Sequence, residues 1–255
     1  MQVIAHQTAT HYQQIGNQNR VIVLLHGWGH QSNTFAQLVP GLSDHFQVIV
    51  PDLPAFGRSA YPNLAADQAW DSAEYVAWLH DFISQVIPNQ PFTLLGHSFG
   101  GKIAALYAAT RHNPHLEHLI IMDASGLPLP LTVKEQLVQS LAHFLPTSLK
   151  QKAKTITQHI LKSQGIAQDY QHASPAQQAI LRKIVREDIA AQLSHITVAT
   201  DVIWGELDTT TPLSAGKRFA RLIPNATLHC IAQSGHVPFH DQPLVTLKTI
   251  LKIAL

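Results

Sequence analysis

The sequence predicts an α/β protein built around a parallel sheet whose strands are joined by crossover helices. Short apolar runs rich in Val and Ile alternate with longer segments in which apolar residues recur at helical spacing. Most of these runs lack polar alternation, as expected for strands that helices cover on both faces. The length of 255 residues provides one large domain, or two small ones, with a sizeable buried core.

Apolar runs of strand length define the predicted sheet. The strands are Val21–Leu25, Gln47–Val50, Phe92–Leu95, Leu119–Met122, Asp201–Trp204 and Thr227–Ile231. A further strand is predicted earlier in the chain, around Tyr12–Ile15.

The segments between these strands are predicted to be helices. Asp71 followed by Glu74 resembles a capping box, and apolar residues then recur at helical spacing until Pro88 stops the run. Small residues make Gly100–Arg111 a helix that can pack close to the sheet. The last two predicted helices are Pro212–Leu222 and Gln242–Ile253.

The interval from about Leu127 to Ala199 departs from the alternation, because it holds helical patterns and no convincing strand. Its two apolar faces consist of Val133, Leu137, Leu141, Phe144 and Leu145, and of Ile180, Leu181, Ile184, Val185 and Ile189. Ordinary helices of the core layer would account for these faces, but the missing strands favour a helical cap over a pocket. We therefore predict a core of residues 1–126 and 200–255 and a cap, or lid, of residues 127–199.

The charge balance excludes several classes of partner. Lys and Arg number 17 against 16 Asp and Glu, and no run of five like charges appears. We expect small or neutral partners and neither nucleic acid nor a membrane. The first 20 residues lack the apolar stretch of a signal peptide, which predicts a soluble cytoplasmic protein. The single cysteine, Cys230, excludes an intramolecular disulfide.

The 17 histidines do not form a recognisable metal motif. HExxH is absent, and the nearest approach to a cluster is His112, His115 and His118 around Pro114. These are predicted to be surface histidines before a strand, and no metal or cofactor is expected.

The strongest local motif surrounds Ser98. The segment Gly96-His97-Ser98-Phe99-Gly100-Gly101 follows the strand Phe92–Leu95 directly and precedes a helix, which is the setting of a nucleophile elbow. A serine on this sharp turn is held in strained backbone geometry above the sheet edge. Ser98 is therefore the candidate nucleophile.

A serine hydroxyl needs a base within hydrogen-bond reach and an acid that orients the base. Asp208 follows one predicted strand and His236 follows the next, which completes the chain order Ser, Asp, His typical of this scaffold. The candidate triad is Ser98, Asp208 and His236. Glu206 and Asp123 compete as the acid, and Asp208 is preferred because its loop lies next to the histidine loop in this order.

Attack on a carbonyl also needs two donors for the developing oxyanion. The backbone N–H groups of Phe99 and Trp28 are the candidates, because Phe99 starts the helix after the nucleophile and Trp28 follows an early strand. Trp28 lies between two glycines in a loop, so its side chain is predicted to bind substrate in an acyl pocket rather than pack in the core.

The chain resembles the α/β-hydrolase superfamily over nearly its whole length. The resemblance is carried by HGWG at 26–29, DLP at 52–54 with FGRS at 56–59, GHSFGG at 96–101, WGELD at 204–208 and SGHVPFH at 234–240. It implies a mostly parallel eight-stranded sheet, a cap inserted after the sixth strand and no cofactor. Ala55 stands where the superfamily usually has glycine, and Phe56 replaces the commoner His. The loop is still expected to form.

The resemblance implies a serine carboxylesterase that cleaves esters of small to medium acyl chains through an acyl-enzyme. The oxyanion and DLP loops look like those of the carboxylesterase branch that includes the methyl ester esterase acting on the pimeloyl carrier protein. A serine nucleophile argues against the dehalogenase and epoxide hydrolase relatives, which have aspartate there.

Three further functions stay open. C–C hydrolases of ring-fission products rank second, because Val237 stands where they usually have tryptophan. Cofactor-free perhydrolases fit the same residues. A non-catalytic ligand receptor on a hydrolase fold belongs to a different class, and it would have no need for a base-activated serine.

Overall fold

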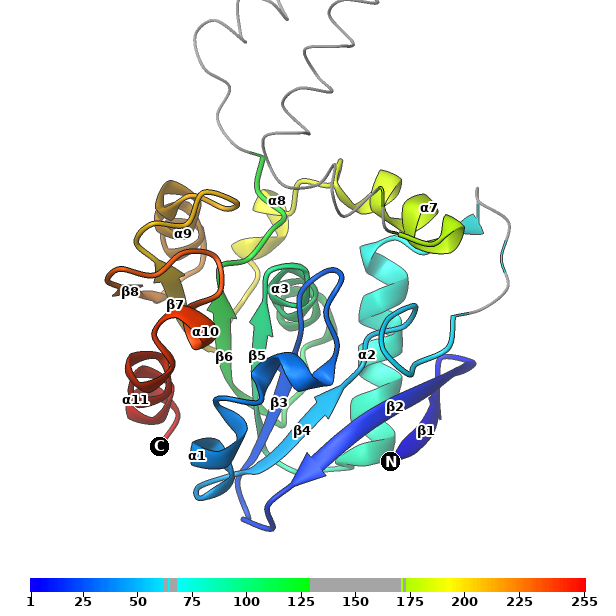
Figure 1. Cartoon of the computed structure of the whole chain (residues 1–255), viewed down its shortest axis with the longest axis horizontal. Helices are drawn as coiled ribbons and strands as arrows, with labels where there is room; N and C mark the ends of the chain where they lie inside the picture. Colours follow the sequence, from blue (N-terminus) through cyan, green and yellow to red (C-terminus); the bar gives the residue numbers. More distant parts are fainter. Residues whose placement is uncertain (62–63, 65–67, 129–170, 172) are drawn as a thin grey trace, which may run out of the picture.

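A computed structural model of the chain describes residues 1–61, 64, 68–128, 171 and 173–255. Its centre is an eight-stranded sheet with the order β1-β2-β4-β3-β5-β6-β7-β8 (Figure 1). Strands β3 to β8 run parallel, whereas β1 and β2 are antiparallel additions at one edge. The strands are β1 Gln2–Ala5, β2 Thr8–Ile15, β3 Val21–Leu25, β4 Gln47–Pro51, β5 Phe92–His97, β6 Leu116–Met122, β7 Ala199–Gly205 and β8 Thr227–Ile231. The predicted α/β class with a mostly parallel sheet is confirmed.

Strand β1 and the first half of β2 are absent from the sequence prediction. They form a hairpin whose turn residues, His6 and Gln7, have φ values of 46° and 61°. A turn with two left-handed residues usually contains Asn or Gly, so His-Gln carries no turn signal in the sequence.

The described helices are η1 Ser32–Phe35, α1 Val39–Ser43, α2 Ser72–Val86, α3 Phe99–Arg111, α7 Pro175–Ile184, α8 Ala190–Leu193, α9 Leu213–Leu222, α10 Pro238–Asp241 and α11 Pro243–Ala254. Of these, α2, α3, α9 and α11 agree with the four helices predicted outside the cap interval, whereas η1, α1 and α10 were not predicted. The capping box of α2 is present, because Asp71 Oδ1 accepts from the N–H of Ala73 at 2.7 Å and Glu74 accepts from the N–H of Asp71 at 2.8 Å.

The core has two layers, one on each face of the sheet. Val21, Val23 and Leu25 of β3 point to the layer that contains α2 and α3. Ile22 and Leu24 point to the opposite layer, with α1 and α11. Every residue of β3 is buried, which explains why its sequence shows no polar alternation.

The predicted cap boundaries at 127 and 199 stay a prediction. The face made by Val133, Leu137, Leu141, Phe144 and Leu145 lies outside the described residues. In the described part, Ile180, Leu181, Ile184 and Ile189 are buried as predicted, whereas Val185 is exposed. Helix α8 packs on α3, and the described residues between β6 and β7 form no strand.

The prediction for the three closely spaced histidines was partly wrong. Strand β6 begins at Leu116, so His118 lies inside the strand and not before it. Its Nε2 is 2.7 Å from Asp201 Oδ2, and His229 binds the other oxygen of the same carboxylate. His118 is thus held by a side chain of the neighbouring strand, which the linear spacing could not show.

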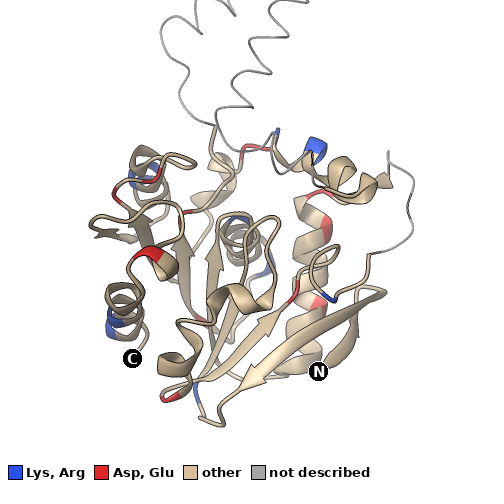
Figure 2. Cartoon of the chain, in the orientation of Figure 1, with Lys and Arg blue, Asp and Glu red and all other residues tan. Residues whose placement is uncertain are grey.

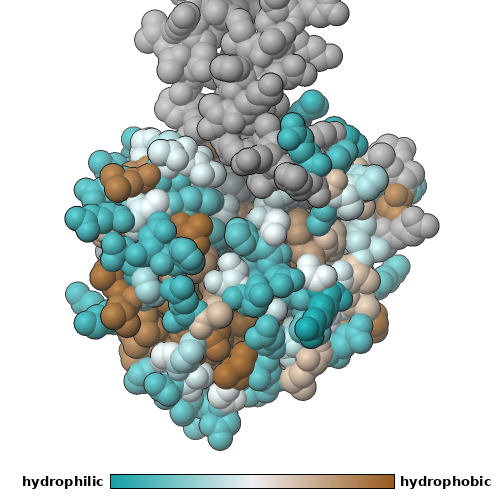
Figure 3. All heavy atoms as spheres, in the orientation of Figure 1, coloured by the Kyte–Doolittle hydropathy of each residue, from teal (hydrophilic) through white to brown (hydrophobic). Residues whose placement is uncertain are grey.

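Charged residues of both signs are spread over many elements (Figure 2). The face seen in Figure 3 mixes hydrophilic and hydrophobic atoms, and hydrophobic atoms gather near α11, where Leu244 and Val245 are exposed. Within the described part of the chain, no helix has the length and apolar character needed to cross a membrane.

Candidate active site

Ser98 lies at the sharp turn between β5 and α3. Its φ of 53° and ψ of −114° place it in a backbone conformation that L-residues rarely adopt. The turn requires two glycines on steric grounds. A Cβ on Gly96 would lie 2.3 Å from the carbonyl oxygen of Gly100, and a Cβ on Gly100 would lie 2.4 Å from the carbonyl oxygen of Leu25. The predicted nucleophile elbow therefore has the backbone geometry that the motif requires.

We predict that Gly100→Ala lowers the free energy of unfolding by about 1–3 kcal/mol and also lowers activity. The new methyl group would push α3 away from the end of β3 and move Ser98 with it. Gly41→Ala is the control, since the added Cβ meets only the flexible end of Leu247. Urea unfolding of both variants tests this, and equal stabilities would contradict it.

The structure brings the three predicted triad residues together, although they come from three separate loops. His236 Nε2 lies 3.0 Å from Ser98 Oγ, and His236 Nδ1 lies 2.8 Å from Asp208 Oδ2. The Asp208 side chain is fully buried, whereas 21% of the His236 side chain is exposed. Both imidazole nitrogens thus have the partners that a nucleophile, base and acid relay needs.

Asp208 is held by a short loop after β7. Its Oδ1 accepts from the N–H groups of Thr210 at 2.7 Å and Thr211 at 3.0 Å, and its Oδ2 accepts from the Thr211 hydroxyl at 2.7 Å. Burial tends to raise the pKa of Asp208, but the hydrogen bond and charge of His236 together with Thr211 lower it below its ordinary value. Asp208 is therefore ionised at neutral pH. Sequence reasoning missed Thr211.

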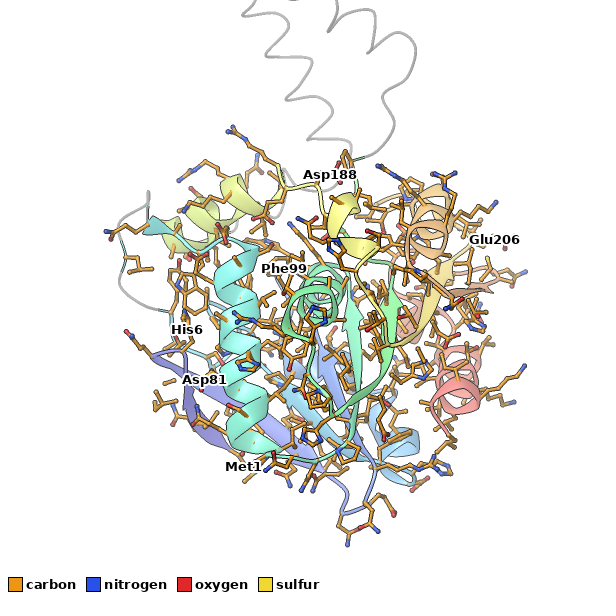
Figure 4. The ribbon with its side chains drawn as sticks, turned by 180° about the vertical axis from the view of Figure 1, so that it is seen from behind. Met1, His6, Asp81, Phe99, Asp188 and Glu206 are labelled. Carbon is orange, nitrogen blue, oxygen red and sulfur yellow. The ribbon has the colours of Figure 1, made fainter. Side chains whose placement is uncertain are left out.

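Glu206, one of the competing acids, does not reach the histidine. It is exposed at the edge of the molecule, away from Phe99 at the start of α3 (Figure 4), and accepts from the N–H of Gln233 at 3.2 Å. Asp123, the other competitor, is buried close to Asp208 and His236 without bonding the imidazole.

The loop that carries His236 packs directly against the loop that carries Asp208. A Cβ on Gly205 would lie 2.0 Å from the carbonyl oxygen of Gly235, so the two loops touch through backbone atoms. The N–H of Leu207 donates to the carbonyl of Ser234 at 2.8 Å, and the N–H of Gly235 donates to Asp241 at 2.8 Å. These bonds position the histidine between the acid and the nucleophile.

His97 is a second support of His236 that sequence reasoning missed. Its Nε2 lies 2.7 Å from the carbonyl oxygen of His236, so this nitrogen carries the proton and donates. Burial, together with the nearby His236, lowers the pKa of His97 to about 3. His97 is therefore neutral. The signal available in the sequence was its position between Gly96 and Ser98.

The two predicted oxyanion donors come from the elbow and from the loop after β3. Phe99 is the first residue of α3, so its N–H has no acceptor within the helix. The N–H of Trp28 donates to no acceptor among the described residues. The loop before Trp28 closely approaches the nucleophile, since a Cβ on Gly27 would lie 3.1 Å from Ser98 Cβ.

The Trp28 side chain packs against the core, whereas the sequence predicted a position in an acyl pocket. It is half-buried and joins the core layer of α2 and α3, with ring centroids 4.8 Å from Phe56 and 5.9 Å from Phe99. Its role in substrate binding stays a prediction. Phe56, one of the departures from the superfamily pattern, thus supports the oxyanion loop from the neighbouring DLP loop.

The DLP loop forms despite Ala55. Ala55 has a φ of 76°, which explains why glycine is usual at this position. The loop is tied to the oxyanion loop by His26, whose Nδ1 donates to the carbonyl of Gly27 at 2.8 Å and whose Nε2 accepts from the N–H of Leu53 at 2.9 Å. Burial lowers the pKa of His26 to about 4, so this histidine is also neutral.

One cluster of side chains has the spacing of metal ligands. It consists of Asp123, Asp208 and His236, whose potential ligand atoms all lie within 4.8 Å of one another. The described part of the chain contains no other such group of three or more His, Cys, Asp and Glu residues. The 2.8 Å separation of His236 Nδ1 and Asp208 Oδ2 is that of a direct hydrogen bond. The arrangement fits a proton relay.

The profile of the alpha/beta hydrolase family matches residues 22–249, and the chain belongs to this family. A pimeloyl-(acyl-carrier protein) methyl ester esterase of Vibrio cholerae is 25% identical over 95% of this chain and 97% of its own length. Among solved structures, an esterase from Exiguobacterium antarcticum covers 100% of this chain and 98% of its own with a TM-score of 0.75 and 22% identity. A meta-cleavage product hydrolase from Pseudomonas fluorescens covers 99% and 96%, with a TM-score of 0.72 and 19% identity. The family and its relatives indicate an esterase-type hydrolase.

Proposed function

We propose that the protein is a serine carboxylesterase that cleaves esters of small to medium acyl chains. The observation that carries this proposal is the position of the His236 imidazole, 3.0 Å from Ser98 Oγ and 2.8 Å from Asp208. The esterase relatives with 25% identity along nearly the whole chain support it.

In the proposed acylation step, His236 Nε2 takes the proton of Ser98 while Oγ attacks the ester carbonyl carbon. The N–H groups of Trp28 and Phe99 stabilise the oxyanion, each by about 3 kcal/mol. His236 then returns the proton to the leaving alcohol, and the acyl group stays on Ser98. Asp208 fixes the tautomer of His236 and stabilises its positive form.

In the proposed deacylation step, water replaces the alcohol. His236 takes a proton from the water, and the resulting hydroxide attacks the acyl carbon. The bond to Ser98 Oγ breaks, and His236 returns the proton to the serine. No cofactor takes part in either step. The substrate is a small-molecule ester, and the near balance of 17 Lys and Arg against 16 Asp and Glu supports neither nucleic acid nor membrane as a partner.

The test is steady-state hydrolysis of p-nitrophenyl esters from acetyl to dodecanoyl. Monomethyl pimelate belongs in the same series, because the Vibrio cholerae relative is named for a pimeloyl methyl ester. We expect turnover with an optimum at short or medium chains. A folded wild type that turns over no ester would contradict the proposal, and hydrolysis of a ring-fission product alone would favour a C–C hydrolase.

A further inference from the structure

Asp123 is a buried carboxyl group beside the triad to which the proposed mechanism assigns no role. It follows β6, has no exposed surface, and has a left-handed φ of 43°. Its Oδ1 accepts from the N–H of Gly205 at 2.8 Å, whereas its Oδ2 is buried and accepts no hydrogen bond from the described residues. A buried polar atom without a partner is costly, so its retention at this point calls for an explanation.

The surroundings of Asp123 are those of the triad acid. An oxygen of Asp123, an oxygen of Asp208 and a ring nitrogen of His236 all lie within 4.8 Å of one another. The carbonyl oxygen of Asp123 also accepts from the Thr211 hydroxyl at 3.1 Å, the same hydroxyl that bonds Asp208. The Thr211 hydroxyl thus contacts the carboxyl group of Asp208 and the main chain of Asp123, beside the imidazole of His236.

The two carboxyl groups differ in protonation state. Burial, followed by the negative charge of Asp208, raises the pKa of Asp123 well above its ordinary value. Two neighbouring buried carboxyl groups resist being ionised together, and Asp208 has the stronger set of hydrogen-bond donors, from Thr210 and Thr211. Asp123 therefore holds the proton, and Asp208 is the ionised partner of His236.

We propose that Asp123 is a reserve acid of the triad, which takes over the support of His236 Nδ1 when the carboxylate of Asp208 is removed. Loss of Asp208 removes the neighbouring negative charge and leaves space into which the Asp123 carboxyl can turn. Asp123 then gives its proton to solvent and accepts the hydrogen bond from Nδ1–H. The kinetic part of this proposal rests on the proposed esterase activity.

The experiment compares Asp208→Ala with the double variant Asp208→Ala/Asp123→Asn. Removal of the acid from a serine triad without a substitute costs about 10⁴-fold in kcat. We expect Asp208→Ala to lose no more than about 100-fold, and the double variant to lose at least about 100-fold more. Asn has the shape of Asp and still accepts from Gly205, but it cannot ionise, so a merely structural Asp123 would leave the two variants equal. Equal rates in two folded proteins would overturn the proposal.

Thr211 provides a matched control, because its hydroxyl lies 3.2 Å from His236 Nδ1 and is the other oxygen that can replace Asp208. The further loss in Asp208→Ala/Thr211→Val is expected to be smaller than the further loss in Asp208→Ala/Asp123→Asn. If Asp208→Ala/Thr211→Val loses the activity of Asp208→Ala while Asp208→Ala/Asp123→Asn keeps it, the threonine is the substitute and the proposal is wrong.

A second readout does not depend on turnover. The infrared spectrum of the wild type at pH 7 is expected to contain the carbonyl stretch of a protonated carboxyl group, absent from Asp123→Asn. The far-downfield proton resonance of His236 Nδ1–H is expected to persist in Asp208→Ala. It is expected to disappear in Asp208→Ala/Asp123→Asn, where no carboxylate is left to accept the bond. If the wild type hydrolyses no ester, the proposed function fails, but these spectra still test the reserve acid.

Discussion

Ser98→Ala is expected to lower ester turnover by at least about 10⁴-fold, because the hydroxyl that attacks the carbonyl is gone. His236→Ala is expected to cause a similar loss, since the two residues act as a unit and the losses do not add. The 3.0 Å bond between them is the physical basis of this expectation. Rates with p-nitrophenyl esters measure both variants.

The fold is expected to survive these changes. Ala keeps the Cβ of Ser98 and the same backbone, so the free energy of unfolding is expected to change by less than about 1 kcal/mol. Ser84→Ala, on the exposed surface of α2, is the control for serine replacement and should retain full activity. Near-native turnover by either folded triad variant would contradict the assignment of nucleophile and base.

The free energy of unfolding is expected to fall steeply as the pH drops from about 6.5 to 4.5. The unfolded chain takes up a proton at each histidine near pH 6.5, whereas folded His26 and His97 do so only at pKa values of about 4 and about 3. The unfolded state therefore binds more protons in this window, and acid favours it. At about 1.4 kcal/mol per pH unit for each group, the two histidines together cost about 5 kcal/mol.

Asp123 has the opposite effect on the free energy of unfolding as the pH falls. Its raised pKa means that the folded protein binds a proton there which the unfolded chain releases above its ordinary pKa of 3.8, so Asp123 stabilises the fold on acidification. We expect it to offset part of the histidine effect. Asp123→Asn should therefore steepen the loss of stability with falling pH.

Urea unfolding at closely spaced pH values measures this dependence. His97→Gln can keep a donor for the carbonyl of His236 but cannot be protonated, so its curve is expected to be shallower than that of the wild type. His45→Gln, at an exposed site, should leave the curve unchanged. A wild-type stability that is level between pH 6.5 and 4.5 would contradict the assignment of two buried neutral histidines.

Much of the sheet could be predicted because its central strands are buried on both faces. The residues of β3 alternate between two apolar layers, so the whole strand is apolar and stands out in the sequence. Strand β1 could not be predicted, because it is a short edge strand whose turn residues, His6 and Gln7, are unusual for a hairpin. The prediction that Val185 belongs to the apolar face of the cap was wrong, because its side chain is exposed. Helical spacing does not show where a helix loses contact with the core.

The residues of the candidate site could likewise be predicted only in part. Ser98, Asp208 and His236 could be proposed from the sequence, because each follows a predicted strand and parallel strands present their carboxyl ends at one edge. The choice between Asp208, Glu206 and Asp123 needed the loop geometry, which directs Asp208 to Nδ1 at 2.8 Å and leaves Glu206 at the surface.

The sequence by itself determined the order of the parallel strands β3 to β8 along the chain, the nucleophile elbow and the candidate triad, because these depend on local apolar patterns and on glycines at fixed offsets. Only the tertiary structure decided which groups support the triad. His97, Thr211 and Asp123 meet His236 and Asp208 from different strands and loops. The protonation states of His97 and Asp123 depend on burial and on neighbours distant in the chain. The local sequence shows neither the burial nor these neighbours.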